Sequence, residues 1–178
     1  MNQNVKRRID LTTNAEEVLA EISLANRGKA AVTEYFYAIN ADRAANLSYF
    51  HANANSGSSL PYARVQLRGV QAPEGTIFYR VAIPSVAAGS SVSISITTLF
   101  THTLHPFPTH ITEHESQLVR YFDSHFLFSA YTTEEQTTLV VLASDKIEGR
   151  SHTEKPSKVS GSEITYGCLL YTSPSPRD

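Results

Sequence analysis

Four histidines fall within one short stretch of the chain, THTLHPFPTHITEH, at residues 101–114. Imidazole nitrogens bind zinc, and the spacings among these histidines occur in zinc sites, but a metal site needs three or four ligands that converge. A metal-dependent enzyme would therefore require His102, His105 and either His110 or His114 to meet at one point. Two prolines within the stretch impose an extended, kinked path that disfavours this convergence.

We therefore expect no metal ion at this stretch. We expect a strand end and a crossing segment whose apolar side chains pack on the core. The side chains expected to do so are those of Leu104, Phe107 and Ile111.

The rest of the chain shows no recognisable catalytic motif. The sequence contains no GxSxG nucleophile elbow, no phosphate-binding loop and no glycine-rich dinucleotide turn. Glu113, Glu115 and Asp123 lie near histidines along the chain, but such proximity does not establish an acid–base pair without geometry. We expect no catalytic residue and no cofactor.

Composition indicates one folded domain. The chain has 178 residues, of which 41% are hydrophobic and 18% charged, which suits a globular protein with a real core. The formal net charge of -2 predicts no nucleic acid partner. The local basic run Lys6–Arg8 is expected to be a solvated strand edge. The single cysteine, Cys168, excludes an internal disulfide framework and a cysteine-based zinc site.

Alternation with a period of two dominates the chain. In residues 91–100, apolar Val92, Ile94 and Ile96 alternate with serines and threonines, as in a strand with one buried face. Short β-branched or aromatic runs separated by Pro, Gly and Ser recur, as in sandwiches. The other strands expected are residues 76–83, residues 118–122 with Phe126 and Phe128, and residues 137–142. The fold class expected is all-β, an antiparallel β-sandwich.

Three segments are harder to assign. Thr13 to Glu16 fits a helix capping box, yet residues 18–24 also alternate as a strand, which we favour. A short helix is expected around residues 41–50, and residues 51–61, HANANSGSSLP, are expected to form a flexible surface loop. Asn46-Leu47-Ser48 is an N-x-[ST] sequon, so Asn46 is a candidate N-glycosylation site.

Residues 100–144 resemble the hallmark stretch of the ribophorin I family. The matching positions are Thr101 and His102, Leu104 to Pro108, Ile111 and Thr112, Ser129 and Tyr131, Gln136 to Thr138, and Leu142 to Ser144. VKRRIDLTT, residues 5–13, is similar to the start of the mature family sequence, where a strand follows. That likeness supports the strand assignment of residues 18–24.

The resemblance implies a non-catalytic subunit of the oligosaccharyltransferase of the endoplasmic reticulum, in which a partner subunit transfers the lipid-linked oligosaccharide to asparagine. It implies a lumenal position, other subunits of that complex as partners, nascent glycoproteins as possible contacts, and membrane association through a transmembrane helix outside these residues. The chain would be an incomplete N-terminal lumenal domain without its signal peptide. A secreted β-sandwich binding module of unrelated function is the alternative.

The last residues, CLLYTSPSPRD at 168–178, have a different character. The family likeness ends at Tyr166 and Gly167, and one DNA sequence that encodes residues 168–178 resembles a transposase-type sequencing adapter. We therefore expect a domain over residues 1–167 and a tail, residues 168–178, that is not native.

Overall fold

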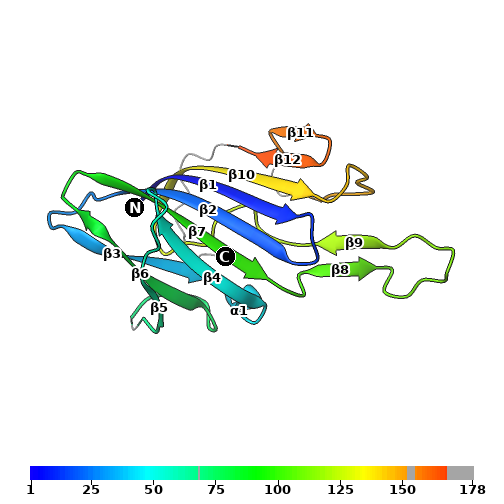
Figure 1. The fold of residues 1–178 in the computed structure, drawn as a ribbon, viewed down its shortest axis with the longest axis horizontal. Helices are drawn as coiled ribbons and strands as arrows, with labels where there is room; N and C mark the ends of the chain where they lie inside the picture. Colours follow the sequence, from blue (N-terminus) through cyan, green and yellow to red (C-terminus); the bar gives the residue numbers. More distant parts are fainter. Residues whose placement is uncertain (68, 152–154, 168–178) are drawn as a thin grey trace.

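The computed structural model describes residues 1–67, 69–151 and 155–167. The tail at residues 168–178, expected to be non-native, lies outside the described residues. Almost all regular structure is β (Figure 1). The elements are β1 (Asn2–Leu11), β2 (Glu16–Ala25), β3 (Val32–Ile39), α1 (Ala41–Ala44), β4 (Leu47–Ala54), β5 (Tyr62–Val65), β6 (Ile77–Val86), β7 (Ser91–Phe100), β8 (Leu104–Phe107), β9 (Leu118–Tyr121), β10 (Thr133–Leu142), β11 (Lys158–Ser160) and β12 (Glu163–Tyr166).

These strands form three sheets. The large sheet has the order β11-β12-β10-β1-β2-β7-β4, a second sheet has the order β3-β6-β5, and β8 pairs with β9 alone. The all-β prediction is confirmed, as are the strands expected at residues 18–24, 76–83, 92–100 and 137–142. One pairing departs from an antiparallel pattern, because β1 and β10 run parallel along their whole length.

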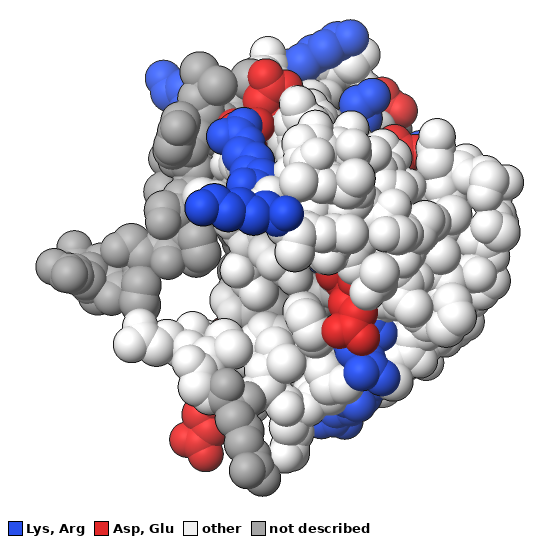
Figure 2. All heavy atoms as spheres, turned by 90° about the vertical axis from the view of Figure 1, so that its left-hand side faces the viewer, with Lys and Arg blue, Asp and Glu red and all other residues white. Residues whose placement is uncertain are grey.

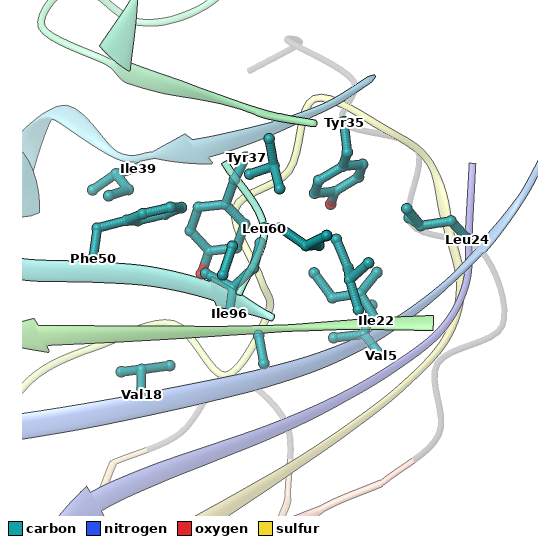
Figure 3. Packing of buried hydrophobic residues seen from close by; sticks show 14 of the residues in the cluster. Val5, Val18, Ile22, Leu24, Tyr35, Tyr37, Ile39, Phe50, Leu60 and Ile96 are labelled. Atoms are coloured by element: carbon teal, nitrogen blue, oxygen red, sulfur yellow. The ribbon is translucent and has the colours of Figure 1, made fainter. Parts of the chain in front are cut away.

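The core lies between the large sheet and the three-stranded sheet. Figure 3 shows Tyr35, Tyr37 and Ile39 of β3 facing Ile22 and Ile96 of the large sheet. Alternation explains this placement, since every second residue of β2 and β7 points to the same face. Burial of these apolar side chains is the main favourable contribution to folding.

The basic run Lys6–Arg8 does not lie on a sheet edge, so that prediction is wrong. β1 is an inner strand between β10 and β2. Lys6 and Arg8 point outward, whereas Arg7 shares the inward face with Val5 and Ile9 and is 7% exposed. A charge at an inward position of a central strand requires a buried partner.

The capping-box alternative at residues 13–16 fails for a local reason. The Thr13 hydroxyl lies 3.4 Å from the backbone nitrogen of Ala15 in a tight turn, and Asp10 accepts two hydrogen bonds from Thr12. Glu16 turns inward as the first residue of β2 and is fully buried. The residues that suggested a helix start therefore close the β1–β2 hairpin.

Two assignments after β3 are partly wrong. The helix expected at residues 41–50 is the single turn α1, after which β4 begins at Leu47. The segment expected to be a loop, residues 51–61, starts as the second half of β4, with Ala52 fully buried and Leu60 also in the core. Pairing with β7 determines this outcome, because residues 50–54 lie opposite residues 94–98 in register.

The histidine-rich stretch differs most from expectation. Residues 104–107 form β8, which pairs with β9 and projects from the two larger sheets (Figure 1). Leu104 packs against the core as predicted, but Phe107 is 47% and Ile111 42% exposed. Residues 118–121 are the strand expected there, whereas Phe126 and Phe128 belong to no strand.

The contrast between Ile96 and Ile111 tests this division between core and hairpin. Ile96→Ala removes a fully buried side chain and should lower the free energy of unfolding by about 2–5 kcal/mol. Ile111→Ala removes the same atoms from an exposed position and should cost less than about 0.5 kcal/mol. Urea unfolding of both variants measures the difference. Equal losses would contradict the placement of residue 111.

Candidate functional site

A cavity of about 380 Å³ lies between the large sheet, the end of β3 and residues 123–133. Its walls are apolar in part, with Val18, Ile39 and Phe100, and polar in part, with Arg7 and Asp123. Pockets of this size and mixed lining are the usual places for a binding or active site. The charged residues at its wall are therefore the first candidates for function.

Four charged side chains meet beside this cavity and form the ionic cluster: Arg7, Glu16, Arg43 and Asp123. Arg7 Nη2 lies 2.5 Å from Asp123 Oδ2, Arg43 pairs with both Glu16 and Asp123, and the Arg43 guanidinium carbon lies 4.2 Å from the Phe100 ring centre. The Asp123 side chain is 10% exposed although its main chain lies at the surface. Two cations and two anions make the cluster neutral.

Tyr121 of β9 completes the cluster. Its hydroxyl donates to Glu16 Oε1 at 2.7 Å and to Asp123 Oδ2 at 3.2 Å. Burial and the two nearby carboxylates raise the pKa of Tyr121, so the phenol keeps its proton as a donor. Burial opposes ionisation of Asp123, but Arg7 and Arg43 outweigh it and lower the pKa of that carboxyl.

The cluster fastens residues 122–132, which we call the covering segment, across the inner face of β1 and β10. Arg7 donates to the main-chain oxygen of Ser124 at 2.6 Å, and Gln136 and Thr138 each donate to that of His125 at 2.6 Å. Buried carbonyl groups need such partners, because an irregular segment does not provide them by strand pairing. The inward polar residues of the sheet are therefore matched to the covering segment.

A second set of contacts holds the far end of the covering segment. Asn2 donates to Ser129 Oγ at 3.0 Å, and the ring of Tyr131 stacks on Tyr35 with centres 5.0 Å apart. The Tyr131 hydroxyl accepts from the backbone nitrogen of Phe36 at 3.2 Å. Ser129 and Tyr131, like Gln136 and Thr138, are positions on which the family resemblance rests, and here they support the fold.

The sequence contained a signal for two members of the ionic cluster. Arg7 and Glu16 have the same parity as the buried residues of their strands, which marks them as inward-facing charges. Arg43 and Asp123 gave no such signal, because they lie on a single helical turn and on an irregular segment. Along the sequence Asp123 is a neighbour of histidines, but its ion-pair partners in the structure are Arg7 and Arg43.

The arrangement suits stabilisation better than acid–base chemistry. A general acid or base needs a pKa near the working pH and a hydrogen bond with the substrate. Arginines engage both carboxylates of the cluster, and the pKa of Asp123 moves away from neutrality.

The histidines of residues 101–114 do not meet. His102 precedes β8, His105 lies on β8, and His110 and His114 lie in the loop before β9, all four exposed. Within residues 1–67, 69–151 and 155–167, no group of three or more His, Cys, Asp or Glu is arranged to hold a metal ion. The convergence required by the metal-dependent alternative is thus not found among the described residues.

Asn46 lies in the turn between α1 and β4 and is half-buried. Its main chain is fixed, since Asn46 N donates to Arg43 O at 3.0 Å and Thr101 N donates to Asn46 O at 2.9 Å. Ser48, the hydroxyl residue of the sequon, is exposed on β4 and donates to the main-chain oxygen of Leu99 at 3.1 Å. The sequon therefore lies at a surface turn beside the sheet.

The molecular surface shows no concentration of one charge on the face in Figure 2, where basic and acidic side chains lie next to one another among uncharged residues. Among the helices of the described residues, none has the length and apolar character that a membrane span requires.

Comparison with known proteins gives consistent matches. The Ribophorin I family matches residues 1–176. This range continues past Gly167 into the tail that we expect to be non-native, and the origin of that tail stays a prediction.

Several curated relatives cover 92% of the chain. Dolichyl-diphosphooligosaccharide–protein glycosyltransferase subunit 1B of Arabidopsis thaliana is 34% identical over 170 residues, which is 36% of that protein. Subunit 1A of the same plant is 28% identical over 172 residues and subunit 1 of Caenorhabditis elegans 27% over 166, each match covering 28% of the relative. The chain thus spans about a third of the length of these relatives.

Asp123→Asn should expose the contribution of the ionic cluster. Removing this charge leaves Arg7 and Arg43 without one buried partner and should cost about 3–5 kcal/mol of unfolding free energy. Glu34→Gln is the matched control, because the Arg80–Glu34 pair is about half exposed and should contribute less than about 1 kcal/mol.

The lowered pKa of Asp123 also predicts how the free energy of unfolding depends on pH in the parent chain and in this variant. Since the folded pKa of Asp123 is lowered, its contribution is present above its unfolded pKa of about 3.9 and is lost as the pH falls towards the folded value. Asp123→Asn should therefore flatten the acid limb of the stability curve. A variant as stable as the parent chain, with the same acid limb, would contradict a stabilising role.

Proposed function

The chain belongs to the ribophorin I family, and we propose that it is a lumenal, non-catalytic part of a subunit of the oligosaccharyltransferase. In this proposal a partner subunit transfers the dolichyl-diphosphate-linked oligosaccharide to asparagine, and this chain supports that reaction as a folded scaffold in the endoplasmic reticulum. The names of the relatives as subunits of this glycosyltransferase support the assignment to the complex.

The observation that supports a scaffold role is that the buried carboxylates are paired with arginines. Asp123 lines the cavity and Glu16 lies buried beside it, and each carboxylate is paired with arginine and with the Tyr121 hydroxyl. Ion pairs of this kind position elements of a fold. For Asp123 the same arginines lower the pKa of the carboxyl, which moves it away from that of a general base working near neutral pH.

Co-purification with activity tests the assignment. The full-length subunit that contains this sequence is tagged and purified from detergent-solubilised membranes of the endoplasmic reticulum. The purified fraction should have activity for oligosaccharide transfer to a peptide with an Asn-x-Thr acceptor. The absence of transfer activity from the purified tagged fraction would contradict membership of the complex. A secreted binding module would be found outside the membrane fraction.

A variant of Glu16 tests whether the chain acts as a scaffold or takes part in the reaction. Glu16→Gln should reduce the amount of assembled complex through lost stability, while the activity per assembled complex stays within about twofold of the parent. Loss of activity per complex in a variant that still assembles would show that the chain participates in the chemistry.

We further propose that Asn46 carries an N-linked glycan when the chain is made in the endoplasmic reticulum. Its side-chain amide has no hydrogen-bond partner among the described residues, and Asn46 lies in the turn before β4, two residues from the exposed Ser48. Treatment with peptide-N-glycosidase should increase the gel mobility of the parent and of Ser48→Thr, which keeps the sequon. The mobility of Asn46→Gln and Ser48→Ala should not change. An unchanged parent would refute the modification.

A further inference from the structure

The β8–β9 hairpin has two different faces. In the antiparallel register Leu104 lies opposite Tyr121 and Phe107 opposite Leu118, so these two pairs lie on opposite faces. Leu104 and Tyr121 pack against the hydrophobic core and attach the base of the hairpin to the body of the molecule. The other face is not used for this attachment.

That other face, which we call the outer face, consists of Phe107, Leu118, Arg120 and Phe122, with the exposed His105 opposite Arg120. The three apolar side chains are 47%, 38% and 67% exposed respectively. Figure 1 shows the hairpin reaching away from the larger sheets, so the outer face is not shielded by their strands. A hairpin of two strands is at best marginally stable by itself in water, and a cluster of exposed apolar side chains marks an interaction site.

Arg120 gives the outer face a defined chemistry. It is the only lysine or arginine between Arg80 and Lys146 in the sequence. Its guanidinium carbon lies 3.9 Å from the ring centre of Phe107 and 5.9 Å from that of Phe122. Among the described residues it forms no ion pair with a carboxylate, whereas Arg7 and Arg43 are both paired.

Stacking on an aromatic ring holds a guanidinium in place and leaves its N–H groups free for a carboxylate. Aromatic residues and arginine are also the residue types most enriched at the centres of protein interfaces. The outer face therefore combines an apolar surface with one oriented cation.

We propose that the outer face of the β8–β9 hairpin docks onto an apolar surface of another protein subunit, with a carboxylate of that subunit paired to Arg120. This inference rests on the proposed function, which supplies the partner as another subunit of the glycosyltransferase. The complementary charge is required because a guanidinium that is buried in an interface without an anion is strongly unfavourable.

A lipid surface fits this hairpin less well. Peripheral binding to anionic lipid uses several lysines or arginines, and here a single arginine is accompanied by Glu113 and Glu115 in the loop at the hairpin tip. Both glutamates are exposed and would be repelled by anionic headgroups. Contact with lipid is therefore an outcome that the test must distinguish from contact with protein.

Site-specific photocrosslinking in the assembled complex provides that test. Phe122→p-benzoylphenylalanine places an aromatic crosslinker on the outer face, and Tyr62→p-benzoylphenylalanine places one on β5, where the parent tyrosine is 42% exposed. Irradiation should join position 122, and not position 62, to a second subunit of the purified glycosyltransferase. Crosslinks from position 122 to lipid, to another copy of this chain or to neither would overturn the proposal, as would equal crosslinking from both positions.

Charge reversal at Arg120 tests the carboxylate. Arg120→Glu should reduce the amount of partner subunit recovered per folded chain at least tenfold, and Arg120→Lys should reduce it less. Arg80→Glu is the control, since Arg80 is exposed on the three-stranded sheet and should leave recovery unchanged. Unchanged recovery with Arg120→Glu would overturn the charge pairing.

The two proposals can fail separately. If the chain assembles with the glycosyltransferase but position 122 does not crosslink to a subunit, the hairpin inference is wrong and membership of the complex stands. If the parent chain does not assemble with the glycosyltransferase at all, the proposed function is wrong, and the partner assigned to the outer face is wrong with it.

Discussion

An irregular segment that lies across the face of a sheet must find hydrogen-bond partners for its own main chain. The covering segment meets this requirement through side chains of the strands below it, with Arg7, Gln136 and Thr138 donating to the carbonyl oxygens of Ser124 and His125. Sheet positions that would otherwise be apolar are therefore polar. The large sheet has a hydrophobic region facing the three-stranded sheet and a polar region facing the covering segment.

Placing Arg7 in this polar region has consequences for distant parts of the chain. Its buried charge is balanced by Asp123, which also pairs with Arg43, while Arg43 pairs with Glu16 at the start of β2. Tyr121 joins the same cluster from the end of β9. The first hairpin, the helical turn, the covering segment and the base of the projecting hairpin thus share one set of electrostatic contacts. A scaffold that presents an exposed hairpin to a partner benefits from such a fixed base.

The sequence predicted the elements whose side chains alternate and failed where tertiary contacts decide. Residues 92–100 alternate strictly, and they form β7 at the predicted place. Arg7 could have been found from its parity with Val5 and Ile9, but the three consecutive basic residues suggested a solvated edge instead. Nothing local identifies Asp123 as the partner of Arg7, since the contact spans more than a hundred positions along the chain. The apolar character of Phe107 predicts a place on the core, but pairing of β8 with β9 places it outside.

The coupling between Arg7 and Asp123 measures the central claim, that a buried ion pair fastens the covering segment to the sheet. In a double-mutant cycle, the free energies of unfolding of Arg7→Met, Asp123→Asn and the double variant are compared with that of the parent chain. The structure predicts a coupling of at least about 2 kcal/mol, because each single change leaves a buried group without its partner. Losses that add within about 0.5 kcal/mol would show that the two residues act independently and would contradict the claim.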